Sequence, residues 1–245
     1  VAKALAAALS DDDTKVASAA ALSLAELKDS DAASEIVEYT SHASEFVRTA
    51  AFNGLKELRS SISLAPAINA MNDTSAAVRQ SAVAVIGWLQ DDNSLPALIA
   101  ATRDIDAEVR RIACSALGFS RKSQAASAIV SALEDESWQV RETAAETISK
   151  SGIKDGIPQL IACTTDEYWQ VRLKAVRSLG KLGDPESIDA IGALVQSKIP
   201  NLRKESAAAL GEIGDKRAVK YLSSIENDAD PDVRKNARWA MSRLK

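Results

Sequence analysis

One hydrophobic position recurs along this chain at a fixed interval. The apolar residue falls 31 residues after its predecessor each time, and arginine follows every occurrence except the first. An unbroken period of this length indicates a solenoid, in which one small structural unit is repeated and stacked on copies of itself. We call this residue the marker of each repeat, and the eight markers are Val16, Val47, Val78, Val109, Val140, Val171, Leu202 and Val233.

The residues that follow each marker repeat with the period of an α-helix. Apolar residues stand at the marker and again four, eight and eleven positions later, which places them on one helix face. Asp or Ser three positions before most markers is expected to cap this second helix of the repeat. Pro200 and Pro231 suit its first turn, and Gly152, Gly183 and Gly214 suit a left-handed end.

A shorter apolar pattern precedes each of these helices. Leu95, Leu98 and Ile99 show it in one repeat, after a polar turn. Each repeat is therefore predicted to be a helix–turn–helix whose apolar faces pack against each other and against the neighbouring repeats. The sequence predicts an all-α solenoid of about eight such 31-residue repeats, forming a single domain over residues 1–245.

The two ends of the array differ from its middle. The first predicted helix, residues 1–9, has almost no polar face. We therefore expect the first repeat to be truncated or covered, with more chain or a partner before Val1. In the last helix Asn236 and Arg238 replace small or apolar residues, so the last repeat is expected to present a polar outer face as a cap.

Composition narrows the possible functions. The net charge is −4 and no segment is strongly basic, which disfavours general nucleic-acid binding. Cys114 and Cys163 lie at unrelated positions, so no disulfide or metal framework is expected, and a reducing compartment such as the cytoplasm is favoured. No apolar run reaches about 20 residues, so no membrane span is expected. His42 is the single histidine, which leaves no nucleophile–base pair and no metal cluster, and we predict neither catalytic residues nor a cofactor.

The repeat itself resembles a known family. The pattern D-x-x-V-R-x-x-A-x-x-x-L-G-x-L-G-D-x-x-A-x-x-x-L stands almost whole at 168–195 and 230–241. It is similar to the HEAT-like repeat of the phycobilisome-lyase type, and the resemblance covers the entire chain. It implies a right-handed α-solenoid whose second helices line a concave binding face. The functions implied range from scaffolds and complex subunits to bilin lyases and a di-iron hydroxylase, but the His-Glu pairs of the hydroxylase are missing here.

The arginine after each marker has two interpretations. It could form a basic ladder for phosphate or carboxylate ligands, or it could tie neighbouring repeats together. We favour the tie, because the position flanks the buried stripe and acids such as Asp29, Asp91, Asp184 and Asp215 recur in the turns. The residues concerned are Arg48, Arg79, Arg110, Arg141, Arg172, Arg203 and Arg234.

Aromatic residues gather on the predicted exposed side of the second helices. Trp88 and Phe119 hold the same slot in adjacent repeats, beside small Ala84 and Ser115, which would leave an open apolar shelf. Aromatic and arginine side chains concentrate binding energy at interfaces. Trp138 and Trp169 share another slot. Alternatively, Trp88 and Phe119 fold over their own helix ends, and Trp138 and Trp169 fill gaps between repeats.

We therefore predict a non-catalytic scaffold, or a subunit of a larger complex, that binds another protein or a peptide along the second helices. Because the later repeats are more basic, one end of the partner is expected to be acidic. The alternatives are a bilin-lyase-like protein that handles a chromophore and, less favoured, a nucleic-acid-binding solenoid. The predicted contact residues are Trp88, Phe119, Arg111, Trp138, Trp169, Leu173, Arg177 and Lys181.

Overall fold

The computed structural model describes residues 1–244, which form sixteen α-helices and no β-strand. The helices come in eight consecutive pairs, one pair to each repeat. The first helices are α1 (Ala2–Ala8), α3 (Ala33–Ile36), α5 (Leu64–Ala70), α7 (Leu95–Ala101), α9 (Ser123–Ser131), α11 (Ile157–Cys163), α13 (Ile188–Ala193) and α15 (Val219–Ser223). The second helices are α2 (Thr14–Ala25), α4 (Glu45–Leu58), α6 (Ala76–Leu89), α8 (Ala107–Leu117), α10 (Trp138–Ser151), α12 (Trp169–Leu182), α14 (Pro200–Ile213) and α16 (Pro231–Arg243).

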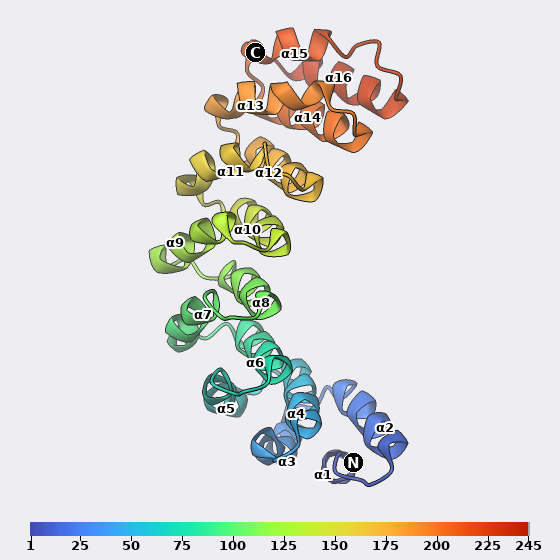
Figure 1. Cartoon of the computed structure of the whole chain (residues 1–245), viewed down its shortest axis with the longest axis vertical. Helices are drawn as coiled ribbons and strands as arrows, with labels where there is room; N and C mark the ends of the chain where they lie inside the picture. The colour runs from blue at the N-terminus through green and yellow to red at the C-terminus, as the bar shows by residue number, and fades with distance from the viewer. Residues whose placement is uncertain (245) are drawn as a thin grey trace. The chain divides into compact units, whose positions relative to one another are not determined.

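The chain divides into two compact blocks, each of four repeats. The N-terminal block is Val1–Ser120, and the C-terminal block starts at Arg121. In the N-terminal block α2, α4, α6 and α8 pack in sequence, with the shorter first helices on the other side (Figure 1). The C-terminal block repeats this arrangement with α10, α12, α14 and α16. The prediction of an all-α solenoid built from helix pairs is confirmed.

The markers form the core of each repeat, with one exception. Val78, Val109 and Val171 are fully buried, as the helical period predicts. Val16 is 42% exposed, and α2 instead buries Ala17, which stands where the other repeats carry arginine. The prediction of a buried marker is therefore wrong in the first repeat, because a small apolar residue beside it faces inward.

The helix ends follow the capping signals of the sequence. The predicted Asp or Ser is the N-cap, and its side chain accepts a backbone N–H bond at four repeats but not at Ser44 or Ser137. Gly152, Gly183 and Gly214 end their helices with φ of 69°, 68° and 73°, in the left-handed region. The equivalent positions in α4 and α6 carry Arg59 and Gln90, with φ of 50° and 52°.

Neighbouring second helices approach closely where glycine meets alanine. A Cβ atom on Gly87 would lie 2.8 Å from the Cβ of Ala116, and one on Gly211 would lie 2.7 Å from that of Ala240. Any side chain at these positions would push the two helices apart. The glycines therefore bring the exposed faces of successive second helices together as one surface.

The last repeat departs in part from the expected cap. Arg238 is exposed, but the Asn236 side chain donates a hydrogen bond of 3.1 Å to the carbonyl oxygen of Lys204 in α14. Asn236 is thus an inter-helix contact and not part of a polar outer face. Within residues 1–244, no helix combines the length and the apolar character that crossing a membrane requires.

Both cysteines lie inside the helical packing. Neither forms a disulfide, and both are buried. Burial raises the pKa of the Cys163 thiol to about 11, so it stays protonated at neutral pH. A buried thiol of this kind packs as a small apolar side chain.

Candidate partner-binding surface

The arginines after the markers join one repeat to the next. Arg79 donates from Nε and Nη2 to the two carboxylate oxygens of Asp104, both at 2.7 Å, and from Nη1 to the carbonyl oxygen of Asp73 at 2.9 Å. The acceptor carboxylate lies 25 residues further along the chain, in the next repeat. The same two-pronged contact occurs in Arg48–Asp73, Arg141–Asp166 and Arg203–Asp228.

These acids are not the ones suggested by the turns of the sequence. Asp29, Asp91, Asp184 and Asp215 instead accept a backbone N–H bond from the residue two positions later and cap short 3₁₀ turns. Their carboxylates bond within the turn, because an aspartate side chain is short enough to accept a hydrogen bond from a backbone N–H two residues later. The suggestion that these turn acids pair with the arginines is therefore wrong.

The arginine contacts also shift the pKa values of the paired aspartates. Burial alone would raise the pKa of Asp73, but hydrogen bonds from the Arg48 side chain and from the Ser75 N–H outweigh it and lower that pKa. For Asp228 the hydrogen bond from Arg203 is the largest effect and lowers the pKa. The pairs are therefore ionised at neutral pH.

The arginine–aspartate pair is incomplete at two positions, where one or both members are replaced. Ala17 replaces the arginine of the first repeat, and His42 stands where its aspartate would be, with ring Nδ1 accepting the Ser44 N–H at 3.0 Å. Arg172 has Ser197 at the aspartate position, and Ser197 Oγ accepts the Ile199 N–H at 3.2 Å. Within residues 1–244, Arg172 has no carboxylate partner and donates only to two backbone carbonyl oxygens.

The remaining two arginines make the same contact with the backbone. Arg110, which is buried, and Arg234 each donate from Nη1 to carbonyl oxygens five and six residues earlier. At all seven positions the guanidinium group is therefore anchored within the molecule, which supports the interpretation as a tie over that of an open ligand ladder.

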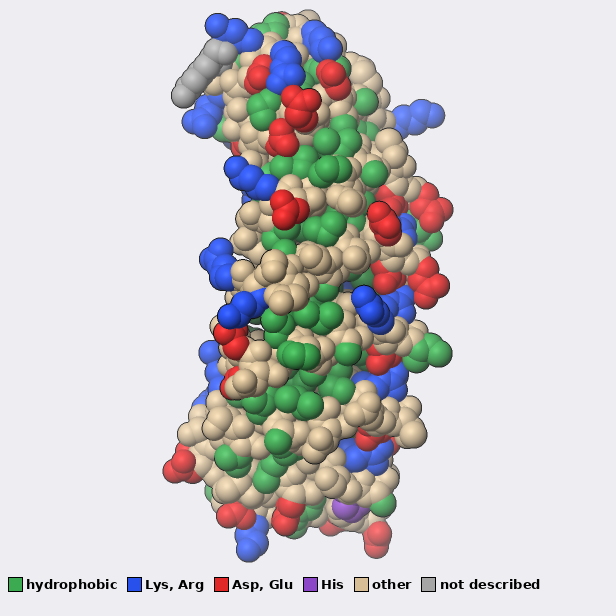
Figure 2. Space-filling view, turned by 90° about the vertical axis from the view of Figure 1, so that its left-hand side faces the viewer, with side chains coloured by type: hydrophobic (Ala, Val, Ile, Leu, Met, Phe, Trp, Pro, Cys, Tyr) green, Lys and Arg blue, Asp and Glu red, His purple; other side chains and the backbone are tan. Residues whose placement is uncertain are grey.

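The exposed aromatic side chains all lie in or beside the second helices. Among residues 1–244 these are Phe46, Trp88, Phe119, Tyr168, Trp169 and Trp239. In each block, the side that carries the first helices (α5 and α7 in the N-terminal block, α9 and α11 in the C-terminal block) shows apolar side chains along its middle and charged ones along its margins (Figure 2). None of these exposed aromatic residues belongs to a first helix.

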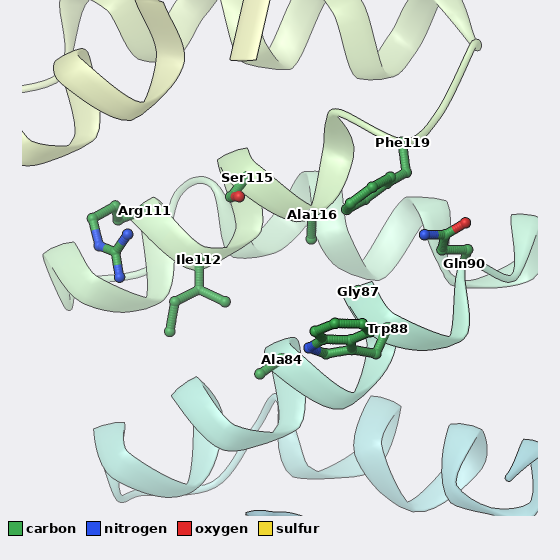
Figure 3. A pocket seen from close by; sticks show the side chains of 9 residues that line it. All are labelled: Ala84, Gly87, Trp88, Gln90, Arg111, Ile112, Ser115, Ala116 and Phe119. Carbon is green, nitrogen blue, oxygen red and sulfur yellow. The ribbon is translucent and has the colours of Figure 1, made fainter. Parts of the chain in front are cut away.

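Trp88 and Phe119 border one pocket of about 320 Å³ between α6 and α8. Trp88 is 45% exposed and Phe119 65% exposed. Their rings lie at the same end of the pocket, and Ile112 points into it from α8 (Figure 3). The small side chains Ala84 and Ser115 leave room between them, as the sequence indicated.

The polar groups of this pocket stand at its two ends. Arg111 lies at one end and Gln90 near the aromatic end (Figure 3). Arg111 donates to Glu108 at 2.5 and 2.7 Å, and this contact lowers the pKa of Glu108. The predicted role of Arg111 as a charge partner is therefore shared with an internal carboxylate.

Arg59 contacts the ring of Trp88, which lines the pocket, and sequence reasoning missed this residue. Its guanidinium carbon lies 4.4 Å from the centroid of the Trp88 ring, a cation–π contact between neighbouring repeats. The Arg59 side chain is exposed and forms no ion pair within residues 1–244. The available signal was its position, since it holds the left-handed slot that other repeats give to glycine.

The C-terminal block presents its aromatic residues differently. Trp138 is half-buried and stacks on Tyr168 with ring centroids 5.4 Å apart, whereas Trp169 is 38% exposed. Leu173 is half-buried, Lys181 is exposed, and Arg177 holds Glu205 through two hydrogen bonds. Trp169, Leu173, Arg177 and Lys181 follow one another at four-residue steps along α12, whereas Trp138 belongs to α10 and its ring makes a contact between repeats.

A second apolar hollow on the N-terminal block was not predicted. Leu22 of α2 and Phe46 of α4, both exposed, border a pocket of about 370 Å³. The hydroxyl of Thr49, which lines the same pocket, has no hydrogen-bond partner among residues 1–244. In the described part of the chain no group of His, Cys, Asp and Glu side chains could hold a metal ion.

Comparison with known proteins identifies the family. The model for HEAT repeats matches residues 1–68, 43–111, 64–149, 95–167 and 157–242. The chain therefore belongs to the HEAT-repeat family, and the resemblance noted in the sequence is confirmed. No curated protein matches the sequence.

Several solved structures share the fold. YibA of Escherichia coli is 20% identical with a TM-score of 0.77, covering 98% of this chain and 91% of YibA. The CpcE–CpcF phycocyanin lyase of Nostoc is 19% identical with a TM-score of 0.56, covering 86% of this chain and 94% of that one. Kap95p, in its structure with RanGDP, is 15% identical with a TM-score of 0.67, covering 99% of this chain and 39% of Kap95p. At these identities the likeness concerns the fold.

Proposed function

We propose that this protein is a non-catalytic binding subunit or scaffold that holds a partner protein or peptide on its second helices. The observation that carries the proposal is the pocket between Trp88 and Phe119 on α6 and α8. Two large aromatic side chains left in water beside a hollow of small residues favour a partner that covers them.

The wider surface supports the same function. Apolar groups at the pocket are flanked by charged and polar ones, which resembles the apolar centre and polar rim of protein interfaces. HEAT solenoids commonly present such extended faces, because each repeat adds one more helix to the same side. The predicted contacts Trp169, Leu173, Arg177 and Lys181 extend the proposal to the C-terminal block.

Neither alternative gains an observation of its own. The chromophore-handling alternative rests on family resemblance, and the fold it shares with a lyase is common to solenoids of other functions. Nucleic-acid binding would need free cations along the face. Arg177 is paired with Glu205 there, and Lys150 and Lys174 both hold Glu146 at 2.7 Å.

The proposal predicts loss of partner binding when both pocket aromatics are truncated. The chain and its Trp88→Ala/Phe119→Ala variant are used to isolate a partner, whose affinity is then measured calorimetrically with purified proteins. Loss of about 2 kcal/mol or more, roughly thirtyfold in Kd, is expected because buried aromatic anchors dominate interface energy.

Ile105→Ala is the matched control for this test. Ile105 is 91% exposed and lies outside the pocket, so its truncation should leave affinity unchanged. All variants should keep the helical circular dichroism of the parent. Unchanged affinity in the double variant would contradict the proposal, and loss of folded helix would instead assign the two rings to the core.

A further inference from the structure

We infer that the Trp88–Phe119 pocket receives a bulky apolar side chain of a partner segment that carries an acidic residue next to it. The inference rests on the proposed function and specifies its occupant. The apolar side chain enters between the two rings, and the carboxylate is bound by Arg59.

The shape and lining of the pocket select the apolar group. The volume of about 320 Å³ is at the lower limit of ordinary ligand pockets, which suits one large side chain. Trp88, Phe119 and Ile112 supply apolar walls, and Gly87 and Ala116 keep the floor free of larger groups. A polar or small side chain would leave these walls poorly covered.

The charge beside the pocket selects the acid. The guanidinium carbon of Arg59 lies 4.4 Å from the centroid of the Trp88 ring, and the Arg59 N–H groups have no carboxylate partner within residues 1–244. A guanidinium in this position binds a carboxylate with two parallel hydrogen bonds. A bound segment that fills the pocket passes Trp88 and therefore comes within reach of Arg59.

The neighbouring charges leave Arg59 available for this role. Glu57, the acid nearest to it on α4, is held by Lys28 at 3.2 Å and Lys56 at 3.4 Å. These contacts lower the pKa of Glu57, with the hydrogen bond from Lys28 as the largest cause. Arg111, at the far end of the pocket, already holds Glu108. The free donors at the aromatic end are thus those of Arg59.

The test compares three fluorescein-labelled peptides that differ at a central position and its neighbours. One carries Leu followed by two acidic residues, one carries Leu followed by two lysines, and one carries Ala followed by the same acids. Fluorescence anisotropy with the full chain should rank the Leu-acid peptide first. We expect the Ala peptide to bind about tenfold more weakly and the Leu-lysine peptide about threefold more weakly.

Two variants assign the effects to their residues. Arg59→Gln should abolish the preference for acid over lysine and keep the preference for Leu over Ala. Glutamine is a suitable replacement, because Gln90 already adopts the equivalent left-handed conformation in the next repeat. Ser115→Trp, from an exposed position on the pocket wall, should fill the pocket and weaken all Leu peptides to the level of the Ala peptide.

The outcomes separate this inference from the proposed function. Equal binding of the acidic and basic Leu peptides, or a preference for acid that survives Arg59→Gln, would overturn the inference. Absence of binding by every peptide at millimolar concentration would overturn it too. In each case the proposed function is judged independently by the partner affinity of the Trp88→Ala/Phe119→Ala variant.

Discussion

At the scale of single residues, the aspartate that stands five positions before most markers does more than cap a turn. Asp104 accepts two hydrogen bonds from Arg79 and a third from the N–H of Asp106. One side chain thereby fixes the loop of its own repeat and the first turn of the second helix of the previous repeat. Where the arginine is absent, as at Ala17, the acid is absent too, and His42 keeps only the bond to the backbone.

Ser197 marks the place where this tie is open and predicts a stabilising substitution. Ser197→Asp should give Arg172 the carboxylate that its equivalents have, since Nη1 of Arg172 is already held by backbone carbonyls. We expect a gain of about 1 kcal/mol in the free energy of unfolding, measured by urea denaturation, because the new pair would be partly buried and two-pronged.

The matched control is Ser197→Asn, which can accept the Ile199 N–H but carries no charge. It should leave stability within about 0.5 kcal/mol of the parent. The gain should also vanish when Ser197→Asp is combined with Arg172→Met. A gain that persists in the double variant would show that it does not come from this pair.

At the scale of helices, the C-terminal ends of the second helices differ in backbone strain. Three second helices end on glycine in the left-handed conformation, which costs glycine little, whereas α4 and α6 end on Arg59 and Gln90 in the same conformation. A residue with a Cβ is strained there by about 1–2 kcal/mol. Both exceptions lie next to Trp88: Gln90 lines its pocket, and Arg59 contacts the Trp88 ring as a cation.

Gln90→Gly should therefore stabilise the chain. The expected gain is about 0.5–1 kcal/mol in the free energy of unfolding, since relief of backbone strain exceeds the extra entropy of glycine in the unfolded chain. Thermal and urea unfolding would both measure it.

Gly183→Ala is the reciprocal test. An added Cβ on Gly183 has no neighbour within 4 Å, so its effect reports backbone conformation alone. It should destabilise the chain by about 1 kcal/mol. If both variants had no effect, the conformation of the helix ends would not limit stability.

At the scale of the whole molecule, ionised carboxylates recur from repeat to repeat. Asp73, Asp104, Asp166 and Asp228 all have lowered pKa values, in each case with a hydrogen bond from arginine among the causes. The pKa of Glu146 falls from 4.5 to about 2, first because of the hydrogen bond from Lys150 and then that from Lys174. Glu212 is the exception, since burial raises its pKa.

These pKa values predict loss of stability in acid. A carboxyl group with a lower pKa in the folded chain binds fewer protons there than in the unfolded chain, so it stabilises the fold above its unfolded pKa. That contribution is lost as the pH falls from the unfolded pKa through the folded pKa. For Glu146 this interval runs from 4.5 to about 2. Thermal unfolding recorded from neutral pH downward should show the melting temperature falling across this range.

Asp104→Asn separates one pair from the rest. At neutral pH it should cost about 2 kcal/mol, because the charge-assisted bonds to Arg79 are weakened. The difference from the parent should shrink as the pH falls, since the parent loses the same charge by protonation. A difference that stayed constant with pH would show that the charge of Asp104 contributes nothing to stability.

The sequence also predicted a single domain over residues 1–245. That the two blocks form a single domain remains a prediction.

The repeat and its helices could be predicted in detail, and the binding surface only in part. Markers, caps and glycine ends are local signals, so they predicted the helix pairs correctly. The one error is in the first repeat, where Ala17 is buried in place of the marker Val16. Trp88 and Phe119 could be grouped because they share a slot in adjacent repeats. Arg59 could not be grouped with them, because its contact with Trp88 joins different slots of two repeats.

The sequence by itself determined the repeating helix pair, because the apolar residues recur with periods of 3.6 and of 31 residues. Only the tertiary structure decided which acid each arginine meets, that Trp138 stacks on Tyr168, and that a pocket opens beside Trp88. The physical reason is that these contacts join side chains from different repeats. Their distances depend on how closely successive helices approach, and the glycine–alanine contacts set that approach.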